Sequence, residues 1–112
     1  MVDFTQTIGD NVRLYMELYG YNQVDLAAAM GISPSAVRSW LKYGHTPRAK
    51  QIEQLCEIFN CTYERLVTPQ TAETIRHDIL TNHIIDAVNK LNDEGKKKVL
   101  QYAGDLAERY KK

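Results

Sequence analysis

The stretch from Gln23 to Trp40 constrains the fold of this chain more than any other part of the sequence. Apolar residues recur at helical spacing on both sides of one glycine, Gly31. A tight turn needs a residue that tolerates positive φ, so Gly31 is expected to end a short helix. Ser33 then caps a second helix, and Pro34 takes its first position, where a missing N–H costs nothing. The pattern therefore predicts two short helices joined by a tight turn.

Three further helices are predicted around this pair from the same periodic signals. The first, Phe4–Tyr19, follows a capping box that Asp3 and Gln6 can form. A fourth helix is expected over about residues 48–59, and Thr62 can cap a short fifth helix that ends near Val67. The expected inward-facing residues of the five helices are Ile8, Val12, Tyr15, Tyr19, Leu26, Met30, Val37, Trp40, Leu41, Ile52, Leu55, Cys56 and Phe59.

The remainder of the chain, from Thr68–Ala72 onward, is expected to be a separate helical element. Two amphipathic segments, about Ala72–Leu91 and Asp93–Lys111, are hinged at Asn92. Joined by a short turn, they form a two-helix hairpin with an apolar face to bury. So small a hairpin has little core of its own, so it must pack on the first domain or on another subunit. We thus predict an all-α chain with one domain at residues 1–67 and a hairpin at residues 68–112.

The distribution of charge favours a partner rich in phosphate, although the net charge is zero. No acidic residue lies between Asp25 and Glu53. The same interval holds four basic residues and one histidine, namely Arg38, Lys42, Arg48 and Lys50, and His45. A neutral protein with one basic, acid-free face can engage nucleic-acid phosphates there. The alternative is that these four basic side chains are clustered by chance.

At these residues the chain resembles the Xre/Cro family of bacterial and phage helix-turn-helix repressors. The resemblance covers about Ile8 to Val67, and its spacing has a mechanical basis. A small residue stands where the two helices meet, a glycine makes the turn, and a β-branched residue fills the angle between the helices. The matching residues are Gln23, Leu26, Ala27, Gly31, Val37, Trp40 and Pro47.

The resemblance implies a five-helix, lambda-repressor-like domain whose third helix reads DNA. By position, the residues expected to contact base edges are Pro34, Ser35, Arg38 and Ser39. Those expected to contact phosphates are Asn22, Gln23, Lys42, Tyr43, His45 and Arg48. Arginine can bond two atoms of a guanine edge, which makes Arg38 the strongest candidate for base readout. Its alternatives are a phosphate contact or a solvated side chain.

Two departures from the family pattern bear on this prediction. The family often pairs an arginine in the first helix with a glutamate after the tryptophan position, and here Met16 and Leu41 hold those places. Replacing both members of a buried ion pair by apolar residues is often neutral or stabilising. The family's loop glycine usually stands three residues after the tryptophan, whereas here Tyr43 stands there and Gly44 follows. The displaced glycine changes the geometry of the loop, on which the contacts expected of Tyr43 and His45 depend.

Other chemistry finds no support in the sequence. Cys56 and Cys61 are expected to be reduced and structural, and no grouping of His, Cys, Asp and Glu has metal-ligand spacing. No nucleophile is accompanied by a base, so we expect no enzymatic activity, cofactor or metal. The run Lys96–Lys98 is either a second DNA contact or a solvated face. No leader segment or apolar span is evident, so we expect a cytoplasmic protein with no membrane partner.

These features together predict a sequence-specific DNA-binding transcriptional regulator. We expect a homodimeric repressor, of phage or mobile-element type, that reads a pseudo-palindromic operator. The residues expected to hold the dimer are Ile79, Ile84, Val88, Val99, Leu106 and Tyr110. The segment after Val67 is too short for a self-cleaving domain, so release is expected from an antirepressor, from another protein partner or from degradation. The alternative function is a protein-interaction module, antitoxin-like or a developmental regulator, whose hairpin binds a partner while DNA binding is secondary.

Overall fold

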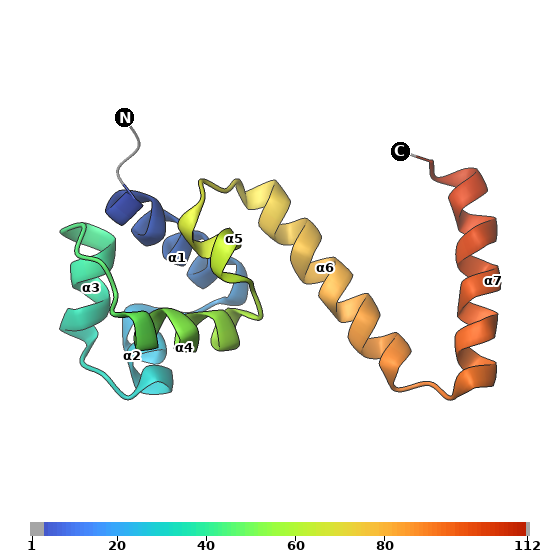
Figure 1. Cartoon of the computed structure of the whole chain (residues 1–112), viewed down its shortest axis with the longest axis horizontal. Coiled ribbons are helices and arrows are strands. Elements are labelled where there is room, and N and C mark those ends of the chain that lie inside the picture. The colour runs from blue at the N-terminus through green and yellow to red at the C-terminus, as the bar shows by residue number, and fades with distance from the viewer. Residues whose placement is uncertain (1–3, 112) are drawn as a thin grey trace. The chain divides into compact units, whose positions relative to one another are not determined.

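The structure is a computed structural model that describes residues 4–111, with side chains from Thr7 onward. The described residues form helices and no strand, so the all-α prediction is confirmed (Figure 1). The helices are α1 (Phe4–Tyr19), α2 (Gln23–Met30), α3 (Pro34–Lys42), α4 (Ala49–Phe59), α5 (Tyr63–Val67), α6 (Ala72–Asn89) and α7 (Asp93–Arg109).

The helix boundaries follow the local signals closely. Arg48 lies just before α4, in extended conformation, rather than in its first turn. The helices α6 and α7 end at Asn89 and Arg109, each two residues before the predicted limit. The capping box expected of Asp3 and Gln6 lies outside the described side chains.

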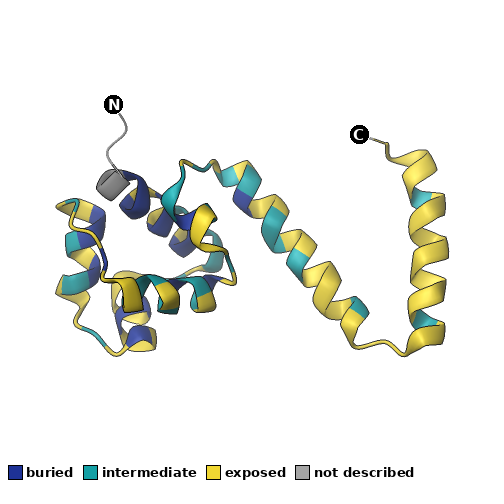
Figure 2. Cartoon of the chain, in the orientation of Figure 1, coloured by how far each residue is buried: buried dark blue, intermediate teal, exposed yellow. Residues whose placement is uncertain are grey.

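The described residues up to Arg76 form one compact unit whose centre is α1. This helix packs against α3, α4 and α5, while α2 packs against α3 and α4. Most of the predicted inward-facing residues are buried, and so are Ala27, Leu66 and the first-turn residue Ile75 of α6 (Figure 2). The ring of Phe59 stacks on Tyr15 at a centroid distance of 5.1 Å and on Tyr19 at 5.9 Å. Trp40 is 4% exposed, which confirms that it is a core residue.

The apolar face of α4 departs from the prediction. Leu55 and Phe59 are fully buried, but Ile52 and Cys56 are only half-buried. The helix α5 that follows spans only Tyr63–Val67, too short to cover the whole face. Ile52 and Cys56 therefore line an open groove instead of the core.

Side chains from other helices bind the carboxyl-terminal ends of α2, α3, α4 and α5. The last four carbonyl groups of a helix have no partner within it, so each end needs hydrogen-bond donors from elsewhere. Three of the four donors belong to α1, which thereby fixes the ends of three other helices. The bonds run from Gln54 Nε2 to the Met30 oxygen (3.3 Å), Arg13 Nη2 to the Leu41 oxygen (2.8 Å), Tyr19 Oη to the Phe59 oxygen (2.9 Å) and Asn11 Nδ2 to the Leu66 oxygen (2.8 Å).

The described residues from His77 onward form a second compact unit, made of the rest of α6 and of α7. Asn92, the predicted hinge, caps α7, because its Oδ1 accepts a 2.9 Å bond from the Gly95 N–H. Among the described residues α7 buries none (Figure 2). The large exposed apolar side chains of this unit are Leu80, Ile84, Ile85, Leu91, Val99, Leu100, Tyr102 and Tyr110.

Candidate nucleic-acid interface

The helix α3 has one buried face and one exposed face. Its first turn is capped by Ser33, whose Oγ accepts a 3.3 Å bond from the Ala36 N–H. Val37, Trp40 and Leu41 point into the core. The opposite face therefore presents its side chains to solvent, and four of them are exposed: Pro34, Ser35, Arg38 and Lys42.

The turn before α3 is built as the sequence predicts. Gly31 has φ 71° and ψ 33°, in the left-handed region that favours glycine. The Ile32 N–H reaches back to the Ala27 oxygen at 3.0 Å, which closes a Schellman motif. Ala27 and Val37 are both buried where α2 meets α3. These contacts set the angle at which α3 leaves α2.

Two residues of α1 that the sequence analysis did not single out hold α3 in place. A Cβ atom on Gly9 would overlap the carbonyl oxygen of Trp40, so only glycine permits this approach of the two helices. One turn later, Arg13 bonds the Leu41 oxygen near the end of α3. A signal for Gly9 was available, because glycine inside a predicted helix costs stability unless packing requires it.

The two apolar residues that stand where the family often has an ion pair are both buried. Met16 is 6% exposed and Leu41 is 8% exposed, and both border the same hollow between α1, α2 and α3. The bond from Arg13 to the Leu41 main chain supplies a polar link between these helices. The link between α1 and the end of α3 thus needs no glutamate side chain.

In the loop after α3, the residue in left-handed conformation lies one position later than the family pattern places its glycine. Tyr43 has φ −109°, and the left-handed conformation falls instead on Gly44, at φ 68°. The N–H groups of Tyr43 and His45 both reach the Ser39 oxygen, at 3.2 and 3.0 Å. The turn is therefore one residue wider than a Schellman motif, and the side chains of Tyr43 and His45 are exposed.

The candidate base-contacting residues differ in how available they are. Pro34, Ser35 and Arg38 are exposed. Ser39 is half-buried, and its Oγ donates a 2.6 Å bond to the Ala36 oxygen. Because that bond uses its only proton, Ser39 can accept a hydrogen bond from a base but must break the bond to donate one.

The candidate phosphate-contacting residues lie where helices begin or end. Asn22 and Gln23 are exposed at the start of α2, and Arg48 is exposed just before α4. Asn22 Oδ1 accepts a 2.7 Å bond from the Asp25 N–H. The Nδ2 group of Asn22 is therefore the part of the side chain that would donate a hydrogen bond to a phosphate. Lys42, Tyr43 and His45 are exposed after α3. Helix amino-terminal ends favour anions, and the first turns of α3 and α4 contain no acidic residue.

Comparison with known proteins identifies the domain that carries these residues. Residues 12–66 match the family model described as helix-turn-helix. This segment is a helix-turn-helix domain of the Xre/Cro type. The SOS-response transcriptional repressor LexA from Eubacterium rectale has a similar solved structure, with a TM-score of 0.57 and 23% sequence identity. The similarity covers 63% of this chain and 78% of the LexA chain, and at this identity it shows the fold alone. No curated protein matches the sequence.

The helix-turn-helix domain contains every candidate base-contacting and phosphate-contacting residue. Its α2 and α3 are the two helices of the motif, and the exposed face of α3 is free of acidic residues. A helix with this face fits the width of a DNA major groove. The family match supports a DNA-binding transcriptional regulator. Among the described residues no helix is long and apolar enough to cross a membrane.

Proposed function

We propose that this protein is a homodimeric repressor of phage or mobile-element type. Its α3 enters the major groove, and Arg38 reads a base edge with Pro34, Ser35 and Ser39 beside it. The observation that carries the proposal is the exposure of Arg38 in the middle of α3, on a helix whose other face is locked into the core. Repression, as the direction of regulation, is proposed by analogy with the transcriptional repressor LexA, whose fold is similar.

The phosphate contacts of the proposed complex come from three helix ends. Asn22 and Gln23 at α2, Lys42 with the following loop, and Arg48 at α4 surround α3 in the sequence and are exposed. Phosphate contacts fix the register of a protein on DNA, whereas base contacts select the sequence. These residues therefore supply affinity and orientation, and α3 supplies specificity.

The dimer is proposed to form through the carboxyl-terminal helices. The exposed apolar side chains of α6 and α7, such as Ile84 and Val99, need a partner surface to leave water. The expected contact residues are Ile79, Ile84, Val88, Val99, Leu106 and Tyr110. Two copies then place their α3 helices about 34 Å apart, one turn of DNA.

Selection of bound sites from random duplex DNA, at a stated salt concentration, tests the proposal. We expect a consensus with two-fold symmetry and half-sites centred about 10 base pairs apart. A consensus without symmetry would retain DNA reading but reject the dimer geometry.

The absence of any enriched sequence would favour a second function, a protein-interaction module. The exposed apolar side chains of α6 and α7 support that alternative. Such a surface can bind a different protein, such as an antirepressor, as well as a second copy of this chain.

A further inference from the structure

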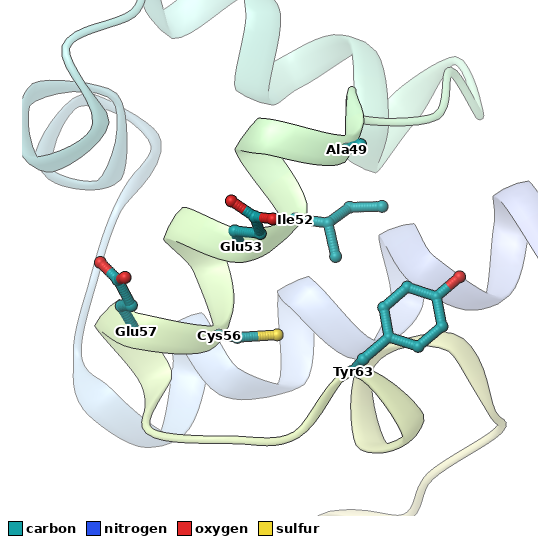
Figure 3. Close-up of a pocket in the computed structure, with 6 residues that line it drawn as sticks. All are labelled: Ala49, Ile52, Glu53, Cys56, Glu57 and Tyr63. Carbon is teal, nitrogen blue, oxygen red and sulfur yellow. The ribbon is translucent and has the colours of Figure 1, made fainter.

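A groove lies on the surface between α4 and α5, and none of the candidate DNA-contacting residues lines it (Figure 3). Its volume is about 610 Å³. Apolar atoms of α4 and the ring of Tyr63 line it, and two carboxylates stand along α4. The lining residues are Ala49, Ile52, Glu53, Cys56, Glu57 and Tyr63.

The thiol of Cys56 faces this groove, and a second thiol stands next to it. Asn60 takes the left-handed conformation, with φ 50°, and ends α4. The Cys61 N–H donates a 3.0 Å bond to the Cys56 oxygen, which closes a Schellman motif. The two residues that this motif brings into side-chain contact are here both cysteines, and both are half-buried.

The backbone bond limits how far apart the two cysteines can be. With standard bond lengths, a 3.0 Å contact from the Cys61 nitrogen to the Cys56 oxygen keeps the two Cα atoms within about 6.9 Å. This limit lies just below the separation of about 7 Å beyond which two cysteines cannot be bridged without backbone movement. The Cys61 thiol also hydrogen-bonds the Cys56 thiol. The pair is therefore arranged in advance for a single atom to join both sulfurs.

The two sulfur ligands determine which kind of atom can bind between them. Sulfur ligands prefer soft centres, and zinc in structural sites takes four ligands. No three side chains of His, Cys, Asp or Glu are grouped for a metal ion in the part of the chain that the structure describes. Linear two-coordinate ions hold two sulfurs on opposite sides, whereas a pyramidal trivalent metalloid holds them side by side. The Schellman bond holds Cys56 and Cys61 next to each other at the end of α4, which matches the side-by-side ligands of the pyramidal geometry.

We propose that Cys56 and Cys61 form a two-thiol site for a trivalent arsenic centre that carries one apolar substituent. The substituent lies in the groove beside Ile52 and Tyr63. In the binding step both S–H bonds break and two As–S bonds form. The oxide oxygen of the arsenical leaves as water with the two protons, and no atom is oxidised or reduced.

The protonation of the pair agrees with such a condensation. Burial raises the pKa of the Cys56 thiol above its ordinary value, and a hydrogen bond from Cys61 opposes this shift. A thiol with a raised pKa is a poor nucleophile toward peroxides, because the thiolate is the reactive form. Condensation with an arsenic oxide begins from neutral thiols and supplies the protons that leave as water.

Titration of the protein with phenylarsine oxide tests the site. We expect one phenylarsenic group per chain with loss of one water by mass spectrometry, and loss of both thiols to a thiol reagent. A ligand that binds the native state better than the unfolded chain raises the melting temperature, so the adduct should melt higher than the free protein. Silver(I), a linear ion, should raise it less.

Matched variants separate a bridged pair from single thiols. Cys56→Ser and Cys61→Ser should each lose the bridged adduct while circular dichroism shows an unchanged helix content. Cys56→Ser combined with Lys50→Cys keeps two thiols but places them at opposite ends of α4, and should also fail. The proposal is overturned by an adduct that consumes one thiol, by one that joins two chains, by a lowered melting temperature, or by a larger rise with silver(I). No readout involves DNA, so the outcome is independent of the proposed function.

Discussion

At the scale of single residues, Arg38 and Lys42 lie on the same exposed face of α3 but are expected to play different parts. Arg38 stands in the middle of the helix, where a guanidinium can reach a base edge, and Lys42 is its last residue. A base contact carries sequence information, whereas a phosphate contact carries only charge and position.

Arg38→Ala should therefore lose about 1–3 kcal/mol of discrimination at one base position, because a bidentate contact to guanine is worth that much. Lys42→Ala should weaken binding to every sequence and lower the salt slope by about 1. Titration of labelled operator and mutant duplexes at several salt concentrations measures both effects. Equal weakening of all sequences by Arg38→Ala would assign Arg38 to a phosphate instead.

Asn11 joins α1 to the end of α5 through hydrogen bonds to main-chain carbonyl groups. It is 1% exposed, and its Nδ2 group donates to the Leu66 oxygen at 2.8 Å and the Thr68 oxygen at 2.7 Å. Asn11→Ala should lower the free energy of unfolding by about 1–3 kcal/mol, because buried carbonyls lose their donor. Urea denaturation measures this loss. Gln101→Ala, at an exposed position of α7, is the control and should change little.

At the scale of elements, the short helices of the DNA-binding domain depend on their neighbours. Isolated helices below about 12–15 residues are marginal in water. The helices α2, α3 and α5 span only 8, 9 and 5 residues. Side chains of α1 and α4 bond their last carbonyl groups, and their apolar faces are buried. The position of α3 is therefore a property of its contact with α1.

Gly9→Ala tests this contact. The added methyl group meets the Trp40 carbonyl, so α1 and α3 must separate, and we expect a loss of about 1–3 kcal/mol and weaker DNA binding. Gly104→Ala is a matched control on α7, where nothing lies within 4 Å of the new Cβ. It should stabilise the protein by about 0.5–1 kcal/mol, as alanine does in a helix. Equal stabilisation by both variants, measured by thermal unfolding, would show that α1 and α3 are not in close contact.

At the scale of the whole molecule, burial divides the chain into two unlike parts. Residues 1–76 have a core of fully buried side chains such as Val12, Leu55 and Phe59. In residues 77–111 the large apolar side chains are mostly exposed, and α7 buries none. Exposed apolar surface of this kind commonly marks an interaction site.

The purified protein should therefore scatter light as a dimer at micromolar concentration. Ile84→Asp combined with Val99→Asp should give a monomer, because charged groups in an apolar interface lose hydration without a partner. Tyr63→Asp, an exposed change on α5, should leave the dimer intact. A wild-type protein that is strictly monomeric would contradict the dimer and leave the interaction-module function as the stronger proposal.

The sequence by itself determined the helices, because the signals that start and stop them act within about five residues. Ser33 and Thr62 cap helices as predicted, and Gly31 takes the left-handed conformation. Asn92, the predicted hinge, caps α7. Helical periodicity likewise identified most of the core, and the helix-turn-helix spacing identified the candidate DNA-contacting residues.

Only the tertiary structure decided how these helices meet. The bonds of Asn11, Arg13, Tyr19 and Gln54 join residues 24 to 57 positions apart. No local pattern encodes such a pairing, because it depends on the distance and angle at which two helices cross. For the same reason the periodicity of α4 placed Ile52 and Cys56 in the core, whereas the short α5 leaves them in a groove. A glycine inside the first helix is unusual in the sequence, but only the folded chain shows that Gly9 and Arg13 both contact α3.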